Sequence, residues 1–83
     1  MTKIDKLIAR LLTRPKDFTY EEARAVLNHF GFIESNKGKT SGSRVEFIKG
    51  TDTILLHKPH PSNQLKHYVV RQLIDTLQEK NYL

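Results

Sequence analysis

The chain has 83 residues, and its 14 Lys and Arg against 9 Asp and Glu give a net charge of +5. This length predicts a single domain spanning residues 1–83 with a small core. The absence of cysteine excludes disulfides and thiolate metal sites. No apolar run has the length of a signal peptide or a membrane span, so we expect a cytoplasmic protein with no membrane partner. The basic charge favours a polyanionic partner.

Two helices are predicted first. The first spans residues 3–13 and stops before Pro15, with one apolar stripe made of Ile4, Leu7, Ile8, Leu11 and Leu12. The second follows Thr19, because Glu22 stands at the reciprocal position of a capping box. Gly31 predicts its end, since glycine favours the left-handed position after a helix. The expected buried face of this helix consists of Ala23, Val26, Leu27 and Phe30.

Three short strands are predicted next, at residues 32–35, 43–48 and 53–57. The short turn containing Gly50 forces the second and third strands to pair antiparallel. Side chains alternate along a strand, so Ile54 and Leu56 share one face of the third strand, and Leu55 and His57 share the other.

The last helix is predicted from about Lys66 to Glu79, with a core-facing stripe of Val69, Val70, Leu73, Ile74 and Leu77. The order is therefore α-α-β-β-β-α. Runs of helices and strands that do not alternate favour an α+β fold. We expect a three-stranded antiparallel sheet with the helices on one of its faces.

Cations gather around the predicted hairpin, at Lys37, Lys39, Arg44, Lys49 and Lys58. Hairpin geometry brings the start of the second strand near the end of the third, so we expect these five residues to form one patch. Clustered Lys and Arg bind phosphate backbones through counterion release. The pattern predicts RNA as the partner.

Two histidines are candidates for proton transfer. His57 ends the third strand, and His60 is oriented by Pro59 and Pro61 on either side. Imidazole titrates near neutral pH, so such a pair can act as base and acid in RNA cleavage without a metal. The alternative for His60 is a loop residue that bonds to the backbone. We expect no metal site and no cofactor, because carboxylates are few near these histidines.

The other two histidines have weaker signals. His29 lies late in the second helix, where a cation is favoured at the surface. His67 opens the last helix, where the partial positive charge of the N-terminus attracts phosphate.

From about Tyr20 onward, the chain resembles the HicA (YcfA-like) family of toxins of type II toxin–antitoxin systems. The resemblance rests on the motifs Phe30-Gly31-Phe32, Gly42-Ser43, Phe47 and Pro59-His60-Pro61 and on the final helix. It implies a fold like that of a double-stranded-RNA-binding domain over residues 20–83, with 1–15 as an added N-terminal helix. It also implies mRNA as substrate and a HicB-like antitoxin as protein partner.

The chain departs from the family pattern at one position. In the family a catalytic histidine follows Gly-Ser, whereas Arg44 stands there in this chain. Arginine stays charged and cannot act as a general base, but it can bind phosphate bidentately. Either His60 or His57 supports a metal-independent mRNA endoribonuclease, or the chain is a non-catalytic RNA-binding or protein-interaction domain.

Overall fold

A computed structural model of the chain describes residues 3–35, 44–57 and 63–83. Its helices are α1 (Lys3–Leu12), α2 (Tyr20–His29) and α3 (His67–Glu79), and its strands are β1 (Ile33–Ser35), β2 (Arg44–Lys49) and β3 (Asp52–His57). The predicted order α-α-β-β-β-α is confirmed, and each boundary lies within one residue of its expected place.

The three strands form one antiparallel sheet in the order β1-β2-β3. Strands β2 and β3 pair from Arg44 opposite His57 to Lys49 opposite Asp52. Only Gly50 and Thr51 connect them, and Gly50 has a φ of +58°. A positive φ at the first of two turn residues suits the right-handed twist of a hairpin and favours glycine.

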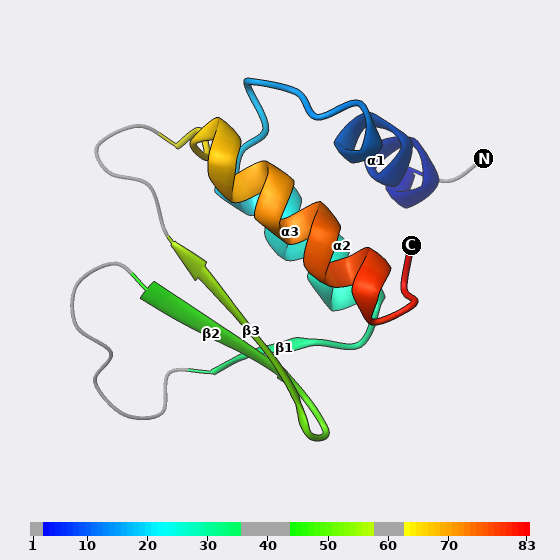
Figure 1. The fold of residues 1–83 in the computed structure, drawn as a ribbon, viewed down its shortest axis with the longest axis vertical. Coiled ribbons are helices and arrows are strands. Elements are labelled where there is room, and N and C mark those ends of the chain that lie inside the picture. The colour runs from blue at the N-terminus through cyan, green and yellow to red at the C-terminus, as the bar shows by residue number, and fades with distance from the viewer. Residues whose placement is uncertain (1–2, 36–43, 58–62) are drawn as a thin grey trace.

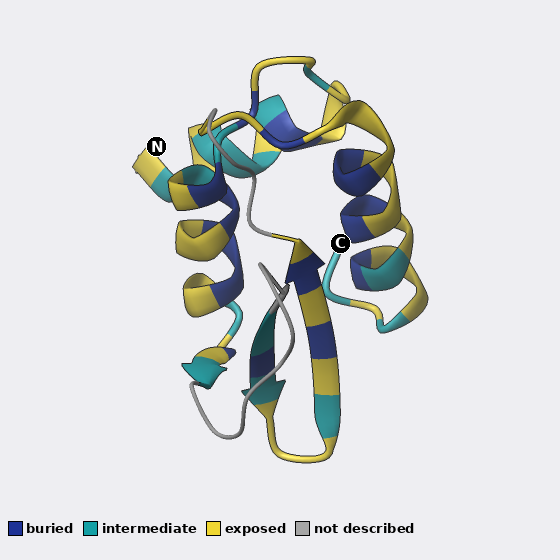
Figure 2. Ribbon diagram, turned by 90° about the vertical axis from the view of Figure 1, so that its left-hand side faces the viewer, coloured by how far each residue is buried: buried dark blue, intermediate teal, exposed yellow. Residues whose placement is uncertain are grey.

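Helices α2 and α3 cover one face of the sheet, as the two ribbon views show (Figures 1 and 2). Burial along β3 alternates as predicted: Ile54 and Leu56 are buried, while Leu55 and His57 are exposed. All five residues of the predicted α3 stripe are buried. The fully buried rings of the core are those of Phe18, Phe32 and Phe47. Phe30, expected in the core, is only half-buried.

The N-terminal helix α1 packs against α2 and α3. Leu11 is fully buried, and Ile4, Leu7 and Ile8 are partly buried against the core. The prediction was wrong for Leu12, whose side chain is 41% exposed. Successive helical residues differ by about 100° around the axis, so the neighbour of the buried Leu11 turns away from the packed stripe.

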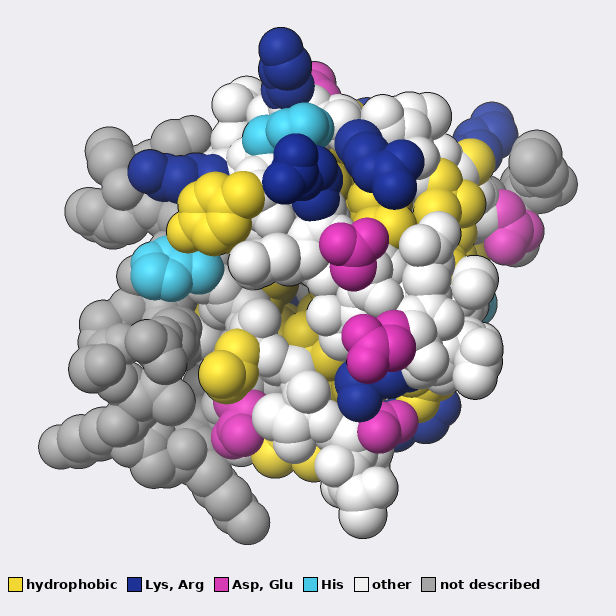
Figure 3. Space-filling model, viewed as in Figure 1, with side chains coloured by type: hydrophobic (Ala, Val, Ile, Leu, Met, Phe, Trp, Pro, Cys, Tyr) yellow, Lys and Arg dark blue, Asp and Glu magenta, His cyan; other side chains and the backbone are white. Residues whose placement is uncertain are grey.

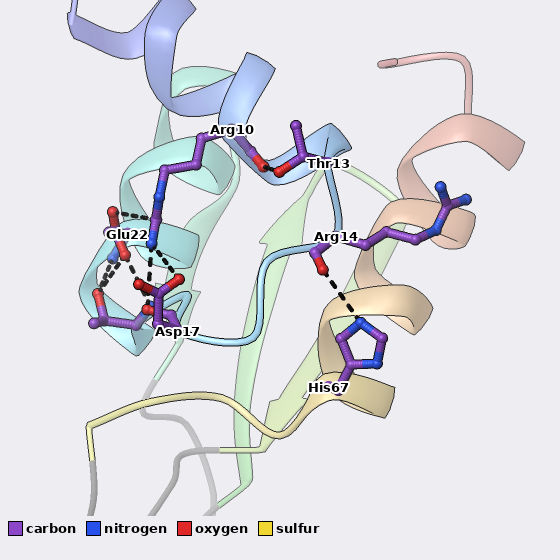
Figure 4. A network of polar contacts seen from close by, with 7 residues as sticks. Arg10, Thr13, Arg14, Asp17, Glu22 and His67 are labelled. Atoms are coloured by element: carbon purple, nitrogen blue, oxygen red, sulfur yellow. Dashed lines mark hydrogen bonds and ion pairs between the residues drawn. The ribbon is translucent and has the colours of Figure 1, made fainter.

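Arg10 joins α1 to the start of α2 (Figure 4). Its guanidinium lies 2.7 Å from Glu22 Oε2 and 2.7 Å from Asp17 Oδ1. The predicted capping box is confirmed, since Thr19 N donates to Glu22 Oε1 at 2.9 Å and Glu22 N donates to Thr19 Oγ1 at 3.2 Å. One carboxylate therefore both caps α2 and holds α1 in place.

Backbone hydrogen bonds join the start of α2 to the segment that leads into α3. Tyr20 N donates to Asn63 O at 3.0 Å, and Leu65 N donates to Phe18 O at 2.8 Å. These bonds hold side by side the two chain segments that flank the sheet, and they fix where α3 begins relative to the start of α2.

Candidate nucleic-acid interface

The backbone register brings two of the predicted site residues together at one end of the hairpin. Arg44, the first residue of β2, is the direct partner of His57, the last residue of β3. Pairs alternate between hydrogen-bonded and non-hydrogen-bonded types. The pair next to the two-residue turn is of the hydrogen-bonded type, and Arg44 with His57 is the sixth pair from the turn. Alternation therefore makes it a non-hydrogen-bonded pair, in which Cα atoms lie about 4.5 Å apart. His57 is exposed, on the face of β3 away from Ile54 and Leu56.

Four predicted site residues lie outside the described residues. Lys37 and Lys39 precede β2, and Lys58 and His60 follow β3. Lys58 is the next residue in the chain after His57, and His60 stands three positions after it. Their assignment to phosphate binding and proton transfer stays a prediction from the sequence.

Lys49 lies away from Arg44, so the expectation of one patch that includes both residues was wrong. It pairs with Asp52 at the turn, at the other end of β2 from Arg44. Its Nζ lies 4.5 Å from the centroid of the Tyr82 ring. The start and end of a six-residue strand are about 17 Å apart at the usual rise per residue, which is too far for shared contacts with one phosphate.

The hairpin turn is also bound to the end of the chain. Lys80 Nζ lies 3.2 Å from Asp52 Oδ1, and Tyr82 Oη donates to Asp52 Oδ2 at 3.1 Å. The hydrogen bonds from Lys80 and Tyr82 hold the pKa of Asp52 below its ordinary value. Lys49 and Asp52 thus serve to anchor the turn to the residues after α3.

The two remaining histidines differ in their contacts. His29 is the last residue of α2, exposed, with its ring 5.3 Å from that of Phe30. His67 opens α3 as predicted, and its Nε2 lies 3.2 Å from the carbonyl oxygen of Arg14 (Figure 4). This contact ties the connection after α1 to the first turn of α3.

Tyr20, the first residue of α2, has a structural role at β1, which is the strand at the other edge of the sheet from β3. Tyr20 is buried and donates to Glu34 Oε2 at 2.8 Å, while Arg24 Nε lies 3.2 Å from Glu34 Oε1. Burial, followed by the bond to Glu34, raises the pKa of Tyr20 well above its usual range. The phenol stays neutral at physiological pH and holds β1 against α2.

A groove between β3 and α3 was not predicted from the sequence. Eleven residues line it, with a cavity volume of about 430 Å³. Its apolar walls include Leu55, Val69 and Leu73, and its polar groups include His57, Gln72 and Asp75. Tyr68 lines it with half of its surface exposed. The sequence did carry one signal: Tyr68 is an aromatic residue outside the core stripe of its helix.

Two absences hold for the described residues. Across residues 3–35, 44–57 and 63–83, no three His, Asp or Glu side chains come together as a metal site would require. Within the same ranges, no helix has both the length and the apolar character needed to cross a membrane.

These features define a small α+β domain with a hairpin that ends in a histidine opposite an arginine. The family described as HicA toxin of bacterial toxin–antitoxin matches residues 20–78, from the first residue of α2 into the last turn of α3. The chain therefore belongs to the HicA toxin family and is the toxin component of a toxin–antitoxin system. No curated protein and no solved structure matches the chain significantly.

Proposed function

We propose that this toxin binds mRNA at the end of the hairpin where Arg44 and His57 are register partners. This pairing is the observation that supports the proposal, because it joins a permanently charged residue to a titratable one across two adjacent strands. An arginine binds a phosphodiester through two parallel hydrogen bonds. Lys37, Lys39 and Lys58, close to this pair in sequence, would add charge along the RNA backbone.

The proposed reaction is cleavage of the RNA backbone by its own 2′-hydroxyl. A histidine takes the 2′-hydroxyl proton, and O2′ attacks the neighbouring phosphorus. The bond from phosphorus to O5′ then breaks, and a second group donates a proton to O5′ as it leaves. His60 and His57 are the candidates for these two roles. Arg44 would stabilise the charge that develops on the phosphorane oxygens.

The alternative is a domain that binds RNA or a protein without cleaving it. The identity of Arg44 favours this alternative, because arginine at this position stays protonated and cannot serve as the base. A toxin of this family has an antitoxin partner, and we propose that it is HicB-like. Binding without cleavage would still allow the toxin to block an mRNA.

RNA binding is tested by a filter-binding titration with single-stranded RNA at several salt concentrations. The logarithm of the affinity should fall linearly with the logarithm of the salt concentration, with a slope that reflects several phosphate contacts. A protein that fails to bind at low salt, or whose binding does not depend on salt, would exclude this function.

Cleavage is tested with two variants in the same assay. His60→Ala should abolish cleavage and leave RNA binding nearly intact, whereas Arg44→Ala should weaken both. If wild type and His60→Ala cleave equally well, the assignment of His60 is wrong and His57 becomes the leading candidate. Arg44→His restores the residue that the family resemblance implies. A gain of ribonuclease activity in that variant, from an inactive wild type, would mean that the non-catalytic alternative is correct.

A further inference from the structure

The groove between β3 and α3 is lined in part by apolar residues that remain exposed to solvent in the folded domain. In the described part of the chain, four large hydrophobic side chains are exposed, and two of them, Leu55 and Tyr68, line this groove. Exposed apolar side chains that converge on one concave surface mark a binding site more often than scattered ones do. The volume of about 430 Å³ falls in the range of small-ligand pockets.

Helix α3 contributes to the groove one aromatic side chain and, further along the helix, two side chains that can form hydrogen bonds. Tyr68, Gln72 and Asp75 stand one helical turn apart and all line the groove. A tyrosine ring offers a stacking surface to any base. The amide of Gln72 can donate and accept hydrogen bonds at a base edge, and the carboxylate of Asp75 can accept from an exocyclic amino group.

The groove is continuous with the hairpin end to which we assign phosphate binding. His57 belongs to both, since it is the register partner of Arg44 and also lines the groove. Strand β3 ends on the side where α3 begins (Figure 1). In the space-filling view, Lys and Arg side chains gather above a hollow with hydrophobic side chains at its base (Figure 3). Lys66 and Arg71, both exposed, flank Tyr68 in sequence.

From these observations we infer that the groove is a nucleobase-binding subsite. A nucleotide next to the phosphate at the Arg44–His57 end inserts its base between β3 and α3. There the base stacks on Tyr68, and Gln72 or Asp75 contacts its edge. The inference rests on the proposed RNA binding and adds the substrate class: the bound RNA is single-stranded, because a base in a duplex is stacked and unavailable.

Charge and polarity favour a base over an apolar peptide segment as the occupant. A groove built for a peptide anchor is lined mainly by hydrophobic groups. Here His57, Gln72 and Asp75 open into it alongside Leu55 and Tyr68. The cations at the start of α3 add a place for the backbone phosphates of the same RNA.

The test compares a short single-stranded oligouridylate with the same oligomer lacking all its bases. Both bind through phosphates, but only the first can stack. Tyr68→Ala should lower the affinity for the oligouridylate by about 5- to 150-fold, the effect of one stacked base. It should leave the affinity for the abasic oligomer unchanged. Tyr68→Phe keeps the ring and should bind as wild type does. Ile33→Ala, an exposed apolar residue on β1, is the matched control and should have no effect.

Tyr68→Leu provides a second variant without a ring, since leucine favours a helix and keeps apolar area in the groove. It should show the same loss as Tyr68→Ala. Thermal unfolding by circular dichroism checks that each variant is folded.

The outcomes separate this inference from the proposed function. If wild type binds neither oligomer, the proposed RNA binding fails and the subsite fails with it. If wild type binds oligouridylate and both ringless variants bind equally well, only the subsite is excluded. If those variants lose affinity for the antitoxin and none for RNA, the groove is a protein-docking site and the inference is wrong.

Discussion

Lys49 lies over the ring of Tyr82, with its Nζ 4.5 Å from the ring centroid. This contact gives the lysine a structural role at the hairpin turn, because a cation over an aromatic face is attracted to it. Tyr82 in turn donates to Asp52, the register partner of Lys49. The hairpin turn and the residues after α3 therefore stabilise each other's position.

The two ends of β2 should differ in their contribution to RNA binding. Arg44→Ala should lower the salt slope of RNA affinity by about 1, as expected for one lost phosphate contact. Lys49→Ala should leave the slope unchanged and reduce the free energy of unfolding by about 0.5 kcal/mol. Filter binding and urea unfolding measure the two effects. Equal slopes for the two variants would contradict the separation of the two residues.

Acid should weaken the anchor at Asp52. Its pKa is lowered in the folded protein by hydrogen bonds from Lys80 and Tyr82, so the stabilisation is complete above the unfolded pKa of about 4. It is lost as the pH falls through the lower folded pKa. Urea midpoints measured from about pH 6 down to about pH 3 should fall less steeply for Asp52→Asn than for wild type. Lys80→Met, which removes the first cause of the shift, should also flatten the profile.

The start and end of α2 should each contribute measurably to stability. Thr19→Ala should reduce the free energy of unfolding by about 1 kcal/mol, because the helix loses a bonded cap. Gly31 has a φ of +98°, and an added Cβ would lie 3.2 Å from Lys49 Cε. Gly31→Val should therefore reduce the free energy of unfolding by at least about 1 kcal/mol. Unchanged urea midpoints in both variants would contradict these roles.

The ion pair between Arg10 and Glu22 should couple α1 to α2. A double-mutant cycle with Arg10→Ala and Glu22→Ala should give a coupling energy of about 0.5–1 kcal/mol, since both side chains are partly exposed and solvent screens the pair. Urea unfolding of the two single variants and the double variant provides the three values. A coupling energy of zero would mean that this ion pair does not stabilise the packing of α1 on α2.

The elements of this fold could be predicted because each has a local sequence signal. The capping box of Thr19 and Glu22 marks where α2 begins, and the helical spacing from Val69 to Leu77 identifies the buried face of α3. Period-two alternation identified the exposed face of β3, including Leu55 and His57. For these residues, local propensity and tertiary packing agree.

The site was harder to predict because it depends on side-chain directions set by distant residues. Lys49 seemed to belong with Arg44, but its direction is fixed by Tyr82 from beyond α3. The groove is lined by Leu55 from β3 and Tyr68 from α3, and neither residue carries a local sign that these two elements form one groove. The roles of His60 and Lys58 remain predictions, since both lie outside the described residues.

The hydrogen bonds from Tyr20 to Asn63 and from Leu65 to Phe18 have a consequence for how the domain opens. They close the segment of chain that contains the whole sheet, so the residues just before and just after this segment separate only when both bonds break. The amides of Tyr20 and Leu65 should then exchange with deuterium only when the entire domain unfolds, and more slowly than the amides at the fraying end of α3.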